Sequence, residues 1–436
     1  MTGLRLERRL TTPAWLPLVI PLVSILAALV ITGAILVATG HDPFSTYSRV
    51  FDRGYLGEGA LSNMLVTATP LVFTGLAAAA AFRMRVFNIG GEGQLYLGAM
   101  AASGAGLALA GAPGAVAVGG MLAAAAVAGL VWAAIPGLLK AYTGTSELIT
   151  SLMLNYIGAL LITYLIFDSH SYWRDVSSFS ARQFPQGKTL AESTHWPSAS
   201  TLLSPATVLL LVVLAGAGTW GWRAWRMRRA SRPAIAVAVV AVLAAVVLAN
   251  ATPAQEVALP LGFALGALAA LAVWVLYRET RFGYEVRVVG DSPAAARYAG
   301  IGTRRKIVAV MALSGVLAAL GGASQIGDFG HVLDPRGLQQ QTLGYTGIVV
   351  AALARFHPLG VPIVALVLGG LTNAGFALQG EDFPSGMVGI LQGALLLCTL
   401  AGEVLGRYRV RTGRRAPAEP EPGGDVSAAD VVLGPA

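Results

Sequence analysis

Residues 82–94 (FRMRVFNIGGEGQ) combine side chains that rarely stand together beside a long apolar run. Asn88 and Gln94 carry amides, Glu92 carries a carboxylate, and three glycines lie between them. Irregular backbone at membrane depth is tolerated only against protein or a water-filled cavity. These three side chains are therefore candidates for the wall of a translocation path, or they form a turn that touches no substrate.

A second polar cluster opens another apolar run, at residues 144–156 (GTSELITSLMLNY). Thr145 or Ser146 can cap a helix there, and Glu147 lies in its first turn, where the helix dipole favours a carboxylate. Asn155 then lies about two turns into the run. A buried amide at such a depth either joins neighbouring helices or lines the path. The same two alternatives hold for Gln325, Tyr345, Asn373 and Gln392.

Several kinds of chemistry are excluded by the sequence. It contains no GxxxxGK[ST] loop, so the chain does not bind ATP by that device. The five histidines lack metal-ligand spacing, and the one cysteine, Cys398, lies inside an apolar run. No serine or cysteine nucleophile has a paired base. We therefore expect no catalytic residue, metal or cofactor on this chain, and an outside energy source if it transports a solute.

The polar loop 278–306 is rich in charge, with seven basic and three acidic residues between apolar blocks. It predicts one short helix. Asp291 or Ser292 can cap this helix, Pro293 suits its first position, and Gly300 can end it in a left-handed turn. Because a helix of two turns is marginal in isolation, it is either presented to a partner or part of a solvated connection.

These segments must be positioned by a membrane protein. The chain is 55% hydrophobic and only 12% charged, whereas soluble domains carry about a quarter charged residues. Apolar runs of about 20 residues predict an all-α polytopic protein of about 12 spans. The expected spans are Leu16–Val37, Ala60–Phe82, Gly93–Gly111, Ala115–Leu139, Leu148–Phe167, Leu202–Trp222, Pro233–Asn250, Val257–Tyr277, Ile307–Gly327, Leu338–Ala354, Pro358–Gln379 and Phe383–Gly402. The run Leu338–Ala354 could instead be a broken or re-entrant segment, because it begins with glutamines and contains two glycines.

Charge sets the orientation. With a cytoplasmic N-terminus, 24 of the 30 Arg and Lys residues fall on the inner side, so both termini are expected in the cytoplasm. The net charge of +8 is thus a topology signal and does not indicate nucleic acid. We expect a cytoplasmic N-terminus (1–15), a transmembrane domain (16–405) with a large extracellular loop (168–201), and a disordered cytoplasmic tail (406–436).

Two stretches resemble the permease subunits of bacterial ABC importers for simple sugars and nucleosides. Residues 86–94 (VFNIGGEGQ) are similar to the family pattern FNIG-x-EGQ. Residues 147–156 (ELITSLMLNY) resemble the family's NEV…MLNY run, with Ser146 where the family has Asn. The EGQ and MLNY forms favour the nucleoside branch over the ribose-type branch.

The loop and a later segment extend this resemblance to about residues 60–400. Residues 280–301 are similar to TxFGxxxRAVGxNPxAAxYAGI, with Ser292 in place of Asn and Val288 in place of Ala. Residues 344–348 and 358–360 fit the family's later GY-x-GI…P-x-G run.

The resemblance implies one permease half of an importer in the bacterial inner (plasma) membrane. A second permease, expected to be a different chain, a cytoplasmic ABC ATPase that binds the ATP, and an extracellular substrate-binding lipoprotein would complete it. The short helix would be the coupling helix that lies in a groove of the ATPase. The implied coupling residues are Asp291, Ser292, Pro293, Ala295, Ala296, Arg297, Tyr298, Ala299 and Gly300.

One departure and several alternatives remain. In the family one span leads into the coupling loop, whereas here residues 202–277 hold three. We therefore expect a core of about 10 spans with an inserted helical hairpin at its periphery. The alternatives are a permease for ribose or another simple sugar, an ATP-independent carrier or channel, and a membrane scaffold that transports nothing.

Overall fold

The computed structural model describes residues 2–8, 16–168, 172–177, 179–203, 255–378 and 386–414, and most of these are helical. The α-helices are α1 (Leu16–Ala38), α2 (Pro43–Phe51), α3 (Ala60–Phe82), α4 (Gly91–Ala108), α5 (Gly114–Leu138), α6 (Glu147–Thr163), α7 (Phe179–Gln183), α10 (Leu261–Glu279), α11 (Arg281–Asp291), α12 (Pro293–Tyr298), α13 (Thr303–Ser324), α14 (Pro335–Gln341), α15 (Leu343–Leu353), α16 (Val361–Ala377) and α17 (Met387–Arg407). Short π-helical or 3₁₀ turns are η1 (Asp52–Leu56), η2 (Leu139–Thr143), η3 (Tyr164–Asp168), η4 (Glu192–Thr194), η5 (Gln325–Gly330) and η6 (Pro358–Gly360). The strands are β1 (Thr2–Arg8), β2 (Ser198–Leu203), β3 (Gln255–Pro260) and β4 (Tyr408–Arg414).

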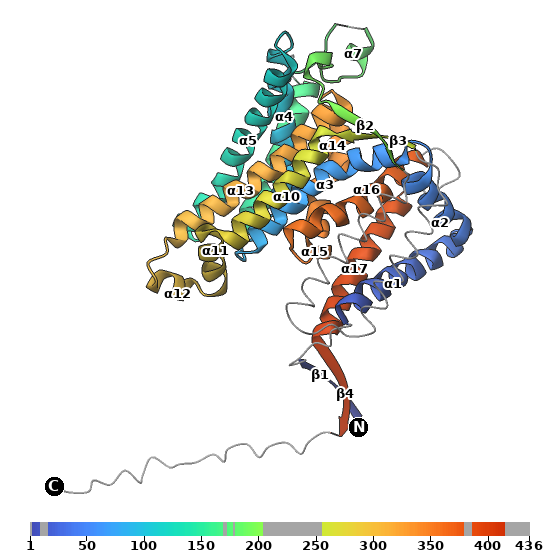
Figure 1. The fold of residues 1–436 in the computed structure, drawn as a ribbon, viewed down its shortest axis with the longest axis vertical. Coiled ribbons are helices and arrows are strands. Elements are labelled where there is room, and N and C mark those ends of the chain that lie inside the picture. The colour runs from blue at the N-terminus through green and yellow to red at the C-terminus, as the bar shows by residue number, and fades with distance from the viewer. Residues whose placement is uncertain are drawn as a thin grey trace, which may run out of the picture.

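Helix α3 lies at the centre of the helical bundle (Figure 1) and packs against α10, α13, α15 and α16. Its most apolar stretch is 89% buried, against 28% for α5, α6 and α10. Within the described residues, six helical segments are long and apolar enough to cross a membrane. A central helix buried all round and outer helices with an exposed apolar side are what a bundle in lipid requires, so this is a multi-pass membrane protein.

Glycines bring α13 close to α4 and α5. A β-carbon added to Gly98 of α4 would lie 2.1 Å from the carbonyl oxygen of Ala319 on α13. Gly129 of α5 and Gly315 of α13 likewise face each other with no room for a side chain. Small residues at helix crossings let backbones approach, which is a common way to pack helices in lipid.

Most expected spans correspond to helices in the structure. The run Ala60–Phe82 is α3 with the same bounds. The run Leu338–Ala354 is broken at Thr342, whose φ of 47° separates α14 from α15, so the broken-segment alternative is confirmed and the single continuous span is wrong. Helix α10 begins at Leu261 rather than Val257, because Val257 pairs in strand β3.

The expected hairpin falls largely outside the description, since spans Leu202–Trp222 and Pro233–Asn250 lie within residues 204–254 except for Leu202 and Leu203. Those two residues belong to β2, which pairs antiparallel with β3 so that Leu203 faces Gln255. Residues 203 and 255, on either side of the undescribed stretch, therefore lie next to each other, and the hairpin itself stays a prediction.

The first and last described segments lie side by side. Helix α1 packs against α17, where the Ser24 hydroxyl donates to the carbonyl oxygen of Cys398 at 3.0 Å, and β1 pairs antiparallel with β4. Residues 406–414 of the expected tail thus form the end of α17 and strand β4, and 415–436 lie outside the description.

The long loop after α6 packs across one end of the bundle. The backbone N–H groups of Leu190 and Trp196 donate to the carbonyls of His331 and Gly327 at 2.9 and 3.0 Å. Helix α7 of this loop and helix α12 lie at opposite ends of the helical bundle (Figure 1). The molecule therefore carries a loop-covered end and an end that bears the short helix α12.

Candidate functional site

The polar loop 278–306 holds two helices rather than the single one expected. Helix α11 is the additional one, and the Thr280 hydroxyl caps it by accepting from the N–H of Gly283 at 3.3 Å. A β-carbon at Gly283 would lie 2.3 Å from the carbonyl oxygen of Tyr277, so α11 turns back directly on the end of α10. The sequence signal for α11 was the Thr cap followed by apolar residues at helical spacing.

Helix α12 begins and ends with the residues that the sequence predicts. The Ser292 hydroxyl accepts from the N–H of Ala295 at 3.2 Å, Pro293 occupies the first turn, and Gly300 has a φ of 72°. The cap is Ser292 and not Asp291, which ends α11 and pairs with Arg85 at 3.7 Å. Of the two capping residues that the sequence allowed, Ser292 caps the helix.

Almost all of α12 faces outward. Ala296 is fully buried, whereas Tyr298 is 98% exposed. The other expected coupling residues apart from Ser292 are also exposed: Asp291, Pro293, Ala295, Arg297, Ala299 and Gly300. One alanine fixes the helix to the chain, and the rest of its surface, including a whole tyrosine side chain, is free to contact another molecule.

Ion pairs hold α11 to the start of α13. The Glu285 carboxylate accepts from Arg281 at 2.9 Å and from Lys306 at 2.5 Å. The hydrogen bond from Lys306, together with that from Arg281, holds the pKa of Glu285 below its ordinary value. The Lys306 ammonium also lies 4.7 Å from the ring centroid of Phe282.

Helix α11 also packs against the segment that links α3 to the start of α4, residues 83–94, which we call the corner. A β-carbon at Gly290 would lie 3.1 Å from backbone atoms of Arg83 and Met84. Helix α11 therefore connects α12 to the segment that contains Asn88 and Glu92.

Asn88 joins three helices through its amide. Its Nδ2 donates to Gln94 Oε1 at 2.9 Å and to the Ser314 hydroxyl of α13 at 2.8 Å. Its Oδ1 accepts from the N–H of Gly90 at 3.0 Å and from Gln94 Nε2 at 3.1 Å. Ser314 in turn donates to the carbonyl oxygen of Ala77 on α3 at 2.7 Å.

Glu92 joins α4 to the start of α15. One carboxylate oxygen accepts from the Tyr96 hydroxyl at 2.8 Å. The other accepts from the N–H groups of Gly344 and Tyr345 at 2.6 and 3.1 Å. The carboxylate therefore satisfies free backbone donors at the helix end that the break at Thr342 creates.

Asn155 joins α6 to the same corner. Its Oδ1 accepts from the N–H of Gly93 at 2.8 Å, and its Nδ2 donates to the Ile89 carbonyl at 2.9 Å and to the Tyr345 hydroxyl at 3.0 Å. The exposed fractions of Asn88, Glu92, Gln94 and Asn155 are 3%, 2%, 1% and 4%. The structure thus brings four of the expected path residues together, with every polar side-chain atom engaged inside the chain.

Of the remaining three expected path residues, Tyr345 belongs to the same cluster through its bonds to Glu92 and Asn155, and it is 37% exposed. Asn373 and Gln325 lie apart from this cluster. Asn373 is buried and donates to the carbonyl oxygen of Arg53 at 3.2 Å. Gln325 lines a cavity of about 10 Å³, which has room for about one water molecule. Other groups around this cavity are Thr67, Gln341 and Thr372 and the rings of Phe329 and Phe376. Sequence reasoning missed these partners, since hydroxyls and single rings in apolar runs give no signal of convergence.

Comparison with known proteins gives one family and several relatives. Residues 60–400 match the family described as the branched-chain amino acid transport system permease component. A glucose ABC transporter permease of Haloferax volcanii is 31% identical over 430 residues, which cover 97% of this chain and 98% of the relative. A guanosine ABC transporter permease of Bacillus subtilis is 30% identical (87% and 92% covered), and a nucleoside ABC transporter permease of Lactococcus lactis is 24% identical (86% and 89%). No solved structure matches the chain.

Proposed function

The chain belongs to the branched-chain amino acid transport system permease component family of ABC importers, and we propose that it carries nucleosides across the membrane while a separate ATPase subunit supplies the energy. In this proposal ATP binds only to the partner, and the chain itself holds no cofactor and no catalytic site. The observation that carries the proposal is the exposed helix α12, which is built and capped but almost uncovered.

The contacts around α12 support coupling to that partner. An isolated helix of six residues is unstable in water, so its fixed position comes from the buried Ala296 and from α11. A tyrosine that is 98% exposed at its end has the size and polarity of a typical interface anchor. We infer that α12 enters a groove of a cytoplasmic ABC ATPase.

A contiguous set of contacts leads from α12 to the spans. Helix α11 touches the corner at Arg83 and Met84, and the corner holds α4, α6, α13 and α15 through Asn88, Glu92 and Asn155. Displacement of α12 by closure of the ATPase would therefore move these helices together. The polar corner transmits motion in this proposal and does not line the path.

Nucleosides are the favoured substrate on three grounds. Segments 86–94 and 147–156 have the forms of the nucleoside branch, and two nucleoside permeases align over most of their length. The small cavity at Gln325 also combines amides and hydroxyls with two aromatic rings. Amides can hydrogen-bond a ribose or a base, and rings can stack on a base, so we propose that the path runs through the groups around this small cavity.

A sugar is the second candidate, because the glucose permease aligns over nearly the whole of both chains. Glucose, ribose and nucleosides share the hydroxyl groups that the amides around Gln325 would bind. Two further partners belong to either version. A substrate-binding lipoprotein would meet the end that carries α7, and a second, different permease would complete the membrane unit.

Uptake by the assembled importer tests the substrate. The complex of both permeases, ATPase and binding protein in liposomes should accumulate labelled uridine or adenosine when ATP is supplied. Uptake of glucose or ribose without uptake of either nucleoside would reject the first candidate in favour of the second.

Site-specific crosslinking tests the coupling. After Cys398→Ser, a Tyr298→Cys variant should crosslink to the ATPase. A Tyr172→Cys variant, in the loop that contains α7, should not. Uptake that continues without any ATPase, together with no crosslink from position 298, would point to the ATP-independent carrier.

A further inference from the structure

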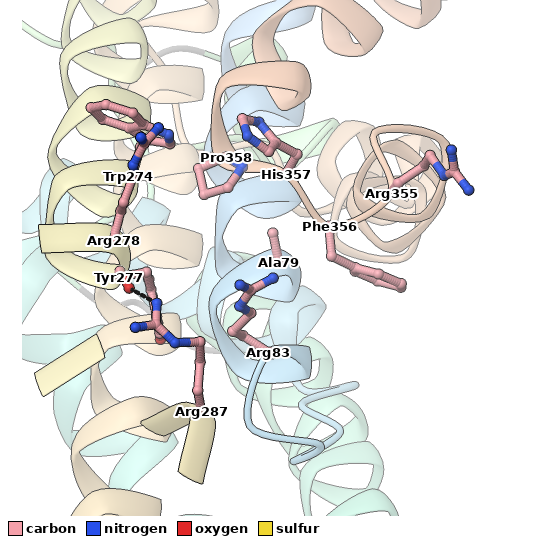
Figure 2. Close-up of a pocket in the computed structure, with 10 residues that line it drawn as sticks. All are labelled: Ala79, Arg83, Trp274, Tyr277, Arg278, Arg287, Arg355, Phe356, His357 and Pro358. Atoms are coloured by element: carbon pink, nitrogen blue, oxygen red, sulfur yellow. Dashed lines mark hydrogen bonds between the residues drawn. The ribbon is translucent and has the colours of Figure 1, made fainter. Parts of the chain in front are cut away.

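A second and larger cavity, of about 340 Å³, opens beside α11 at the ends of α3 and α10 (Figure 2). Its size lies at the lower end of the range for small-ligand sites, about 300–1,000 Å³. The residues that define its chemistry are Arg83, directly after α3, Trp274 and Arg278 of α10, and Arg287 of α11. No Asp or Glu lines it in the described part of the chain.

Arg83 and Arg287 have no carboxylate partner among the described residues. Arg278 is paired with Glu279 at 2.9 Å and lies 4.9 Å from the ring centroid of Trp274. Arg287 donates to the carbonyl oxygen of Tyr277 at 2.6 Å, which leaves its positive charge unpaired. Figure 2 shows the side chain of Arg83 reaching toward the same space. The cavity therefore favours an anion.

The neighbouring surface of α10 is apolar. Leu268, Leu271 and Val275 are exposed, and their spacing of three and four residues places them on one face of the helix. Arg278 follows three residues after Val275, so the stripe leads directly to the cavity. Trp274 lies between the apolar stripe and the cavity, and aromatic residues are common where a span meets the lipid headgroups.

We propose that this cavity binds the phosphate group of an anionic phospholipid, between Arg83 and Arg287, with acyl chains along the stripe Leu268–Leu271–Val275. Guanidinium groups bind phosphate oxygens in pairs, and basic pockets between spans hold anionic lipid headgroups. Soluble phosphates share the headgroup chemistry, but they would make no use of the apolar stripe. The bound lipid would tie the ends of α3 and α10 to α11.

Lipid retention by the purified full-length permease tests this site without the ATPase, so the result does not depend on the coupling proposal. Native mass spectrometry should show phosphatidylglycerol retained in preference to phosphatidylcholine. R83Q should retain about fivefold less phosphatidylglycerol, since each arginine near a membrane surface contributes about that factor. R336Q, on α14, removes the same charge outside the cavity and should retain the normal amount.

Two further arms separate the sources of phosphate. The double variant L271S/V275S should retain less phosphatidylglycerol although both arginines remain. R83K keeps the charge but lacks the planar guanidinium group, so the amount of lipid that it retains should lie between those of wild type and R83Q. Equal retention by wild type and R83Q would overturn the site. Displacement of the lipid by AMP or inorganic phosphate at concentrations below 1 mM (on the order of a metabolite level), unaffected by L271S/V275S, would assign the cavity to a soluble phosphate instead.

Discussion

The corner around Asn88 and the segment 290–302 that contains helix α12 both combine glycines with arginine and an acidic residue, yet their side chains have opposite surroundings. In the corner, Glu92 and its neighbours are almost wholly buried and bonded to the same chain. In α12, only Ala296 is buried and Tyr298 is almost wholly exposed. Similar composition thus serves internal cohesion in one place and contact with a partner in the other. Burial and hydrogen-bond partners, rather than residue type, separate the two roles.

The largest expected effect comes from breaking the corner. Glu92→Leu leaves the N–H groups of Gly344 and Tyr345 and the hydroxyl of Tyr96 without an acceptor. At about 1–3 kcal/mol for each of these three unsatisfied buried donors, we expect a loss of about 3–9 kcal/mol in the free energy of unfolding. Thermal unfolding of the detergent-solubilised permease measures it.

Tyr96→Phe is the matched control for that experiment. It removes one donor and leaves Glu92 its two backbone partners, so the loss should be only about 1 kcal/mol. An unfolding midpoint of Glu92→Leu equal to that of the wild type would show that the corner does not hold the helices together.

The next effect comes from removing the exposed side chain of α12. Tyr298→Ala should leave stability within about 0.5 kcal/mol of wild type, since Tyr298 is almost fully exposed. It should weaken binding of the ATPase by about 30-fold, as expected for an interface anchor worth about 2 kcal/mol. Titration of labelled permease with the ATPase measures the affinity.

Tyr284→Ala is the control within the same loop, because Tyr284 is an exposed tyrosine on α11 rather than α12. A smaller loss of affinity for Tyr284→Ala than for Tyr298→Ala would localise the contact to α12. Equal affinities for wild type and Tyr298→Ala would contradict the contrast between the two regions.

A smaller effect is expected at the end of α12. Gly300 has a φ of 72°, and a residue with a β-carbon loses about 1–2 kcal/mol in that conformation. Gly300→Val should therefore loosen α12 and reduce coupling without lowering the unfolding temperature of the spans. Hydrogen exchange of residues 293–300 should accelerate in this variant, while exchange in α3 stays the same.

The smallest effect is the pH dependence of the attachment of α11. The pKa of Glu285 is lowered from its ordinary value of 4.5 by Lys306 and Arg281, so the ion pairs contribute fully above that value. Their contribution is lost as pH falls through the lower folded-state pKa. The protection of α11 amides from hydrogen exchange should therefore be greater in the wild type than in Glu285→Gln at pH 7. It should fall to that of Glu285→Gln as pH drops through the lowered pKa of Glu285.

Local signals allowed part of this structure to be predicted from the sequence. Apolar length gave the bounds of α3, and the Ser-Pro start with a Gly end gave α12, because both depend on residues that lie close together in the chain. The role of Asn155 was not decided by such signals. Its bond partners, Gly93 and Tyr345, are 62 and 190 residues away, so only the packing of α4, α6 and α15 fixes its role.

The pairing of β2 with β3 has a consequence for how such a chain could change through evolution. Leu203 and Gln255 stand opposite each other, so the ends of the intervening segment are already joined. A version of the gene lacking those codons would need only a tight reversal of the backbone to close the gap. Replacement of residues 204–254 by a short turn is therefore expected to leave α10 and α13 packed on α3.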